Sequence, residues 1–84
     1  MTLQASSSSP VELDVRGLRC PMPLLKTKLE LNKLKPGDHL RIYVTDPGSV
    51  RDFHSYAELS PHKLAEFHQF EEFFEYLFVV GEQS

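Results

Sequence analysis

The chain has 84 residues, with 9 Lys and Arg against 12 Asp and Glu, a net charge of -3 and one cysteine. This length allows one small domain, and the acidic charge argues against a strongly basic nucleic-acid surface. A single cysteine excludes a disulfide within the chain, and no apolar run approaches the roughly 20 residues of a membrane span. With no signal-peptide pattern at the start, we expect a cytoplasmic protein without membrane contact.

The first ten residues, 1–10, include four consecutive serines and little that is apolar, so we expect a disordered tail. After the tail, apolar and charged side chains alternate for six residues, which predicts a half-buried strand. Its apolar side chains are Val11, Leu13 and Val15. Residues 17–19 form the expected turn into a helix.

The first helix is predicted over residues 21–34, directly after the only cysteine, Cys20. Proline is tolerated in a first helical turn because the N–H groups there have no partner within the helix. We therefore expect Cys20 as the N-cap residue and Pro21 as the first helical residue. Pro23 also lacks an N–H group, so the Met22 N–H is the only first-turn donor left to face the sulfur.

Two interpretations of Cys20 follow from this position. The helix N-terminus lowers a thiol pKa and favours the nucleophilic thiolate, and Arg19 and Lys26 supply further positive charge. Alternatively, Cys20 is a small buried hydrophobe, which is the usual role of a free cysteine. The sequence pattern by itself leaves both interpretations open.

Two apolar stripes run along the predicted helix. The first is expected to meet the sheet and consists of Leu24, Thr27, Leu31 and Leu34. The second lies well round the helix and consists of Met22, Leu25 and Leu29. Either this second stripe wraps into the edge of the core, or it forms an exposed docking patch beside Cys20.

The second half of the chain begins with another strand-to-helix unit. Residues 40–45 alternate as a strand, and Asp46 and Pro47 then repeat the arrangement of an N-cap residue followed by proline. The buried side of this second helix is expected to carry Val50, Phe53 and Ala57. The segment 60–62 contains a proline and ends the helix.

Two further strands are predicted to close the domain. The first covers residues 63–69, with Ala65 and Phe67 pointing inward. The aromatic and β-branched content of the last apolar stretch favours a strand over an amphipathic helix. One face of that strand carries Phe74, Tyr76, Phe78 and Val80. Residues 81–84 are expected to form a short C-terminal tail.

The resulting element order is βαβαββ. Right-handed crossovers place both helices on one face of a four-stranded mixed sheet. The predicted fold class is therefore α/β, a two-layer α/β sandwich formed by a single domain of residues 11–80.

The stretch from residue 13 to residue 23, LDVRGLRCPMP, resembles the signature of the TusA/SirA-like family of small sulfur-carrier proteins. That signature is a strand, an Arg-Gly turn and Cys-Pro-x-Pro at a helix start. The later TDPG at 45–48 and RD at 51–52 are similar to the start of the family's second helix. Two departures stand out, because Met22 occupies a position that is often acidic and Thr45 one that is often aspartate.

The resemblance implies that Cys20 accepts a sulfane sulfur from a cysteine desulfurase or another donor protein and holds it as a persulfide. The sulfur then passes to an acceptor protein, in pathways that end in tRNA thiolation, sulfur oxidation or cofactor assembly. The resemblance also implies supporting roles for a set of residues around the cysteine and the second helix start. They are Asp14, Arg16, Gly17, Arg19, Pro21, Pro23, Asp46 and Pro47.

Three other classes of function differ from a sulfur carrier in the features that they require. An interaction or regulatory module would keep the second apolar stripe and use Cys20 structurally, without thiol chemistry. The charge argues against a single-strand nucleic-acid binder, and a dithiol oxidoreductase would need a second cysteine. The four histidines, at positions 39, 54, 62 and 68, show no close metal-ligand spacing, so we expect no metal. We also expect no cofactor and a monomer.

Overall fold

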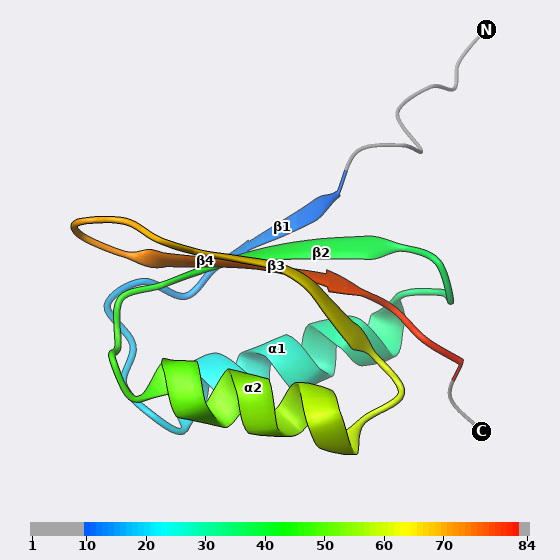
Figure 1. Ribbon diagram of the computed structural model, residues 1–84. Coiled ribbons are helices and arrows are strands. Elements are labelled where there is room, and N and C mark those ends of the chain that lie inside the picture. Colours follow the sequence, from blue (N-terminus) through cyan, green and yellow to red (C-terminus); the bar gives the residue numbers. More distant parts are fainter. Residues whose placement is uncertain (1–9, 83–84) are drawn as a thin grey trace, which may run out of the picture.

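The computed structural model describes residues 10–82, and all but the last residue of the predicted tail at 1–10 lies outside the described residues. The elements follow in the predicted order and form two layers, one sheet and one pair of helices (Figure 1). They are β1 (Val11–Asp14), α1 (Met22–Lys33), β2 (His39–Val44), α2 (Ser49–Leu59), β3 (Lys63–Gln69) and β4 (Phe74–Val79). The predicted two-layer α/β sandwich of βαβαββ order is confirmed. Among the described residues, no helix is long and apolar enough to cross a membrane.

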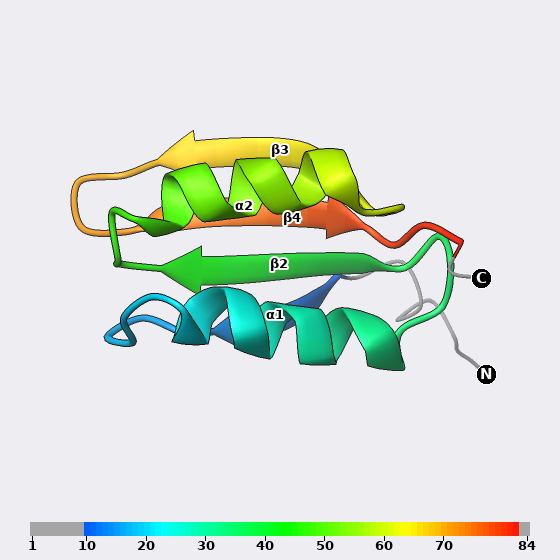
Figure 2. The same ribbon diagram turned by 90° about the horizontal axis from the view of Figure 1, so that it is seen from below.

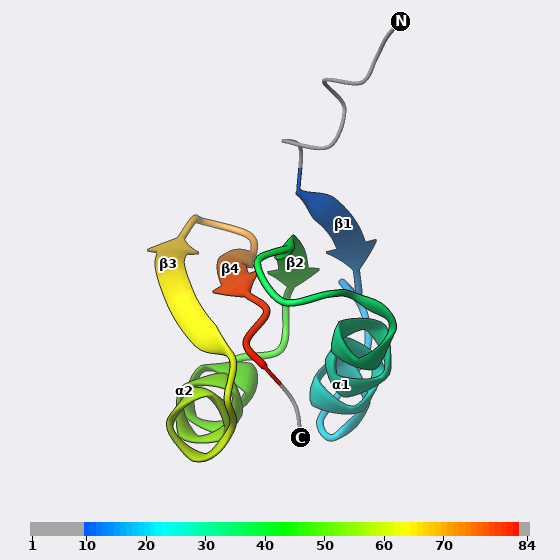
Figure 3. The same cartoon turned by 90° about the vertical axis from the view of Figure 1, so that its right-hand side faces the viewer.

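The four strands form one mixed sheet in the order β1-β2-β4-β3. β1 and β2 are parallel, whereas β4 is antiparallel to both of its neighbours. Both helices cover the same face of the sheet, α1 along β1 and β2 and α2 along β4 and β3 (Figures 2 and 3). Because β1 and β2 are parallel, the loops that lead from them into α1 and α2 meet at one edge of the sheet, which is where open α/β sheets place their sites.

The core lies between the sheet and the two helices. Phe53 of α2 stacks on Tyr76 of β4 with ring centroids 4.4 Å apart. The Tyr76 hydroxyl lies 2.9 Å from the Ser49 hydroxyl, so these two buried polar groups satisfy one another. The other members of the buried core cluster come from the predicted inward faces of α1, β2 and β4, and from Val15 directly after β1. They are Val15, Leu31, Leu40, Ile42, Val44, Phe78 and Val80.

One predicted inward residue, Ala65, is exposed. The pairing of β3 with β4 shifts register between Leu64 and Glu66, which places Ala65 in a β-bulge. The extra residue interrupts the alternation of the strand, so Leu64 and Phe67 pack against the core while Ala65 faces solvent. The strict two-residue period that predicted Ala65 inside does not hold across a bulge.

The chain after β4 is tied back to the β3 side of the domain. The Gly81 N–H donates a hydrogen bond to Nδ1 of His62, at 3.1 Å, and a Cβ at Gly81 would collide with the Pro61 carbonyl oxygen. The His62 residue is 3% exposed, and its burial lowers the pKa of the imidazole. His62 therefore accepts the Gly81 hydrogen bond as a neutral ring.

This arrangement predicts that stability rises with pH across the titration of His62. Because the folded-state pKa is lowered, its contribution is present above the unfolded-state value of about 6.5 and is lost as pH falls through the folded pKa. One proton allows a slope of at most about 1.4 kcal/mol per pH unit. Urea unfolding from about pH 8 to about pH 5 should show this slope in the wild type and a flatter profile in His62→Gln. The exposed His68→Gln variant is the control and should keep the wild-type slope. Equal slopes in the wild type and in His62→Gln would contradict the prediction.

Candidate functional site

Cys20 is exposed and lies in the loop between β1 and α1, at the sheet edge where the two strand-to-helix loops meet. The Cys20–Pro21 peptide bond is cis. The backbone N–H of Cys20 donates a hydrogen bond to Oδ2 of Asp46, at 3.2 Å. Its thiol donates to Oδ2 of Asp52, at 2.9 Å. The cysteine is therefore held from the β2–α2 side of the site, by one carboxylate on its amide and another on its sulfur.

The expected capping register of α1 is wrong. The helix begins at Met22, Pro21 occupies the N-cap position, and Cys20 lies one residue before it. The Met22 N–H does not face the sulfur, because it donates to the Arg19 carbonyl oxygen at 2.8 Å and closes a turn. The first helical hydrogen bond then runs from Leu25 N–H to the Pro21 carbonyl oxygen, at 3.0 Å.

The expected thiolate is also not the resting form of Cys20. The hydrogen bond to Asp52 raises the pKa of the Cys20 thiol above its ordinary value, and loss of hydration and the negative charges of Asp52 and Asp46 act in the same direction. A helix start carries only about half a positive charge, spread over several N–H groups, whereas these carboxylates carry full negative charges. The predicted lowering of the pKa is therefore corrected to a rise.

The role expected of Asp46 changes in the same way. Gly48 occupies the N-cap position of α2, and the Asp46 carboxylate is turned to the Cys20 amide instead of capping the helix. The Asp46 carbonyl oxygen accepts a hydrogen bond from Ser49 N–H at 3.0 Å, which starts the turn into α2. Pro47 is exposed in this turn. Asp46 thus joins the second helix start to the cysteine loop.

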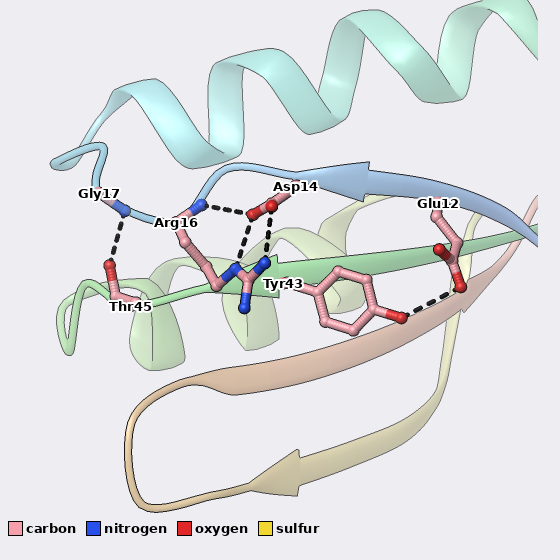
Figure 4. A network of polar contacts seen from close by, with 6 residues as sticks. All are labelled: Glu12, Asp14, Arg16, Gly17, Tyr43 and Thr45. Carbon is pink, nitrogen blue, oxygen red and sulfur yellow. Dashed lines mark hydrogen bonds and ion pairs between the residues drawn. The ribbon is translucent and has the colours of Figure 1, made fainter.

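A second link between the two loops joins Gly17 and Thr45 (Figure 4). The Gly17 N–H donates to the Thr45 hydroxyl at 2.8 Å. Gly17 has a φ of 87°, in the left-handed region that glycine adopts without a Cβ penalty. Thr45 was not predicted as a site residue, although its position directly before Asp46 was the available signal.

Asp14 and Arg16 form an ion pair that braces the start of the loop (Figure 4). The Arg16 guanidinium donates to both Asp14 carboxylate oxygens, at 2.9 and 2.8 Å. These bonds, with one from the Arg16 N–H, lower the pKa of Asp14 to about 2. The guanidinium also lies 5.7 Å from the centre of the Tyr43 ring and 5.6 Å from that of Phe73. The pair therefore fastens the end of β1 to the sheet face that the helices leave open.

The other residues of the Cys-Pro-x-Pro segment divide between surface and core. Arg19 and Pro21 are exposed on either side of the cysteine. Pro23 is fully buried and anchors the first turn of α1 in the core. The loop that presents Cys20 is thus fixed on its C-terminal side by the packing of Pro23 and on its N-terminal side by the hydrogen bond between Gly17 and Thr45.

The second stripe of α1 is exposed, which decides between the two arrangements left open by the sequence. Met22 is 39% exposed, Leu25 47% and Leu29 58%. These side chains therefore form an apolar surface that runs from the start of α1, next to Cys20, along the helix.

Asp52 is a second site residue that sequence reasoning missed. The RD pair at 51–52 belonged to the resemblance, but nothing in the local pattern assigned it a partner. Asp52 lies in the first turn of α2, 32 residues from the cysteine, and the fold alone brings the two side chains together. Among residues 10–82, no group of three or more His, Cys, Asp or Glu side chains could hold a metal ion.

The chain is similar to known proteins in sequence and in fold. The family model described as sulfurtransferase TusA matches residues 11–80. The sulfur carrier protein TusA of Allochromatium vinosum is 46% identical over 55 residues, which are 66% of this chain and 72% of that protein. The putative sulfur carrier protein YrkI of Bacillus subtilis is 39% identical over 54 residues, 64% of this chain and 72% of that one. A SirA-like protein from Desulfitobacterium hafniense has a similar fold, with a TM-score of 0.73 and 23% identity over 86% of this chain and 99% of its own.

Proposed function

Because this chain belongs to the TusA family of sulfur carriers, we propose that Cys20 accepts a sulfane sulfur from a donor protein as a persulfide and passes it to an acceptor protein. The observation that carries the proposal is the place of Cys20. It is the one cysteine of the chain, it is exposed, and it lies where the loops into both helices meet. Donor and acceptor would each reach the same sulfur atom.

The loading step is a sulfur transfer without net oxidation. The Cys20 sulfur, as thiolate, attacks the outer sulfur of a persulfide on the donor's cysteine. A bond forms between the two sulfurs, and the S–S bond of the donor breaks with its electron pair leaving on the donor's cysteine. The proton lost by Cys20 ends on that leaving thiolate. The step as written uses no metal or cofactor.

The donor class that fits this chemistry is an enzyme that makes a protein persulfide, and a cysteine desulfurase is our first candidate. The acceptor is a second protein with a thiol that attacks the Cys20 persulfide in the same way. tRNA thiolation is one destination for this sulfur, and the carrier would contribute to it through its protein partners without binding nucleic acid itself.

We further propose that the exposed stripe of Met22, Leu25 and Leu29 is where the donor protein docks. Apolar side chains beside a nucleophile exclude water when a partner covers them, and they leave orientation to the few polar groups nearby. Methionine adapts to different surfaces because it is flexible and polarizable. Met22 is the member of the stripe that lies in the first turn of the helix, two residues from Cys20.

A second candidate function is a non-catalytic interaction module. Its support is the raised pKa of the Cys20 thiol and the hydrogen bond to Asp52, which give a resting thiol of low reactivity. Such a module would keep the same apolar stripe but would never carry sulfur.

Intact-mass analysis after incubation with a cysteine desulfurase and cysteine separates the two candidates. The carrier is expected to gain the mass of one sulfur atom and to lose it again with a reductant. Because the chain has one cysteine, a gain of one sulfur that the reductant reverses locates the sulfur on Cys20. Absence of an adduct with both a desulfurase and a small-molecule polysulfide, while a known carrier loads in the same assay, would favour the interaction module.

A further inference from the structure

Two carboxylates converge on Cys20 from one side of the site. Asp46, in the β2–α2 loop, accepts the backbone N–H of the cysteine, so its position is fixed by the main chain. Asp52, in the first turn of α2, accepts the thiol hydrogen itself at 2.9 Å. The Asp52 residue is half-buried, whereas Cys20 is exposed, so a partner can reach the sulfur while the hydrogen bond is in place.

We propose that Asp52 is a positioning residue of the carrier, whose carboxylate holds Cys20 on α2 as a neutral thiol until a cationic group of a partner protein competes for that carboxylate. The proposal rests on the role of Cys20 proposed above and adds what controls its sulfur. The hydrogen bond stabilises the neutral thiol over the thiolate. A thiolate has no hydrogen to donate to Asp52, and it would lie against two negative charges. The raised pKa of Cys20 has the same origin.

The same geometry distinguishes the empty carrier from the loaded one. Loading replaces the hydrogen on Sγ with a sulfur atom, so Sγ can no longer donate to Asp52. The restraint on the side chain is then lost, and the outer sulfur, as an anion, is repelled by Asp46 and Asp52. The empty thiol is therefore held on α2, and the loaded side chain is released from it for the acceptor.

The test is the pH dependence of carboxamidomethylation of Cys20 by iodoacetamide, a neutral reagent, followed by intact mass. In Asp52→Asn the midpoint of the rate profile is expected at lower pH than in the wild type, with faster labelling near neutral pH. A lower pKa increases the fraction of Cys20 present as thiolate, but each thiolate is then a weaker nucleophile. On a logarithmic scale, the labelling rate should therefore rise by about half as much as the thiolate fraction. Glu58→Gln removes a carboxylate from an exposed position on the same helix and should leave the profile unchanged.

An unchanged midpoint in Asp52→Asn, or slower labelling at every pH, would overturn the proposal; the second result would make Asp52 a general base. A measurement on the wild type alone can still overturn the proposal if the variant does not fold. The midpoint of the folded protein should lie above that of the same chain unfolded in urea, and a midpoint equal to or below it would count against the proposal. Neither measurement requires a sulfur donor, so failure of sulfur loading and failure of this proposal are separate results.

The part played by a cation is tested with two small disulfides, dicationic cystamine and dianionic dithiodiglycolate. In each reaction the Cys20 thiolate forms a mixed disulfide and expels one reagent thiolate, so no oxidant is needed. The ratio of the cystamine rate to the dithiodiglycolate rate is expected to be severalfold larger in the wild type than in Asp52→Asn. Equal ratios in the two proteins would show that Asp52 does not select a cationic partner.

Discussion

Replacing Cys20 with serine is expected to abolish sulfur loading and to leave the domain folded. A hydroxyl group cannot form a persulfide, and the chain has no other thiol. Serine can still donate a hydrogen bond toward Asp52, and exposed substitutions change the free energy of unfolding by about 0.5 kcal/mol or less. Intact mass with a desulfurase and cysteine should therefore show no adduct, while the urea unfolding curve stays close to that of the wild type.

The matched control moves the thiol instead of removing it. Ser55 is exposed on α2, so Cys20→Ser with Ser55→Cys keeps one exposed cysteine in the chain but takes it out of the loop. This variant is expected to react with small-molecule polysulfide but to load poorly from the protein donor. Sulfur on Cys20→Ser, or equally fast enzymatic loading of the relocated cysteine, would show that the Cys20 site has no special role.

Leu25→Glu is expected to slow sulfur transfer from the protein donor by about tenfold or more. An unpaired charge buried against an apolar partner costs more than the roughly 1.4 kcal/mol that corresponds to a factor of ten. Leu25 is 47% exposed, so the free energy of unfolding should change by only about 0.5 kcal/mol. Single-turnover loading, measured by intact mass against time, gives the rate, and iodoacetamide labelling of Cys20 should be unaffected.

Leu59→Glu is the matched control for this prediction. Leu59 is 88% exposed and ends α2, whereas Asp52 lies in the first turn of that helix. The Leu59→Glu substitution introduces the same charge at a distance from the sulfur, so this variant should be loaded with sulfur at the wild-type rate. If the two glutamate variants load equally fast, the stripe is not the docking surface. If Leu25→Glu instead costs about 2 kcal/mol or more of stability, its side chain contributes to the core.

The fold was predictable because its local patterns agree with one another. The alternation in β2 and β4 and the first apolar stripe of α1 each identify a buried face, and those faces meet in the core around Leu31, Ile42 and Tyr76. Such patterns depend on periods of two and of about 3.6 residues, which a sequence displays directly. The bulge at Ala65 escaped prediction because one inserted residue leaves no mark on composition.

The site was predictable in its location but not in its electrostatics. The prolines around Cys20 correctly placed it beside a helix start, yet the register was off by one residue because the Met22 amide closes a turn onto Arg19. The sign of the pKa change depends on Asp46 and Asp52, which reach the cysteine only through the pairing of two loops. Contacts between distant segments decide such details, and local spacing does not encode them.

The most direct measurement of the central claim is cyanolysis of the loaded protein. Wild-type protein is loaded by a cysteine desulfurase and cysteine, freed of enzyme and substrate, and treated with cyanide while intact mass and thiocyanate are followed. Cyanide removes a sulfane sulfur as thiocyanate and returns the thiol, whereas a sulfinic acid, whose two added oxygen atoms have nearly the same mass as one sulfur atom, does not revert. We predict that the added mass disappears with one thiocyanate formed for each loaded chain. An added mass that persists in cyanide, with no thiocyanate formed, would contradict a persulfide on Cys20.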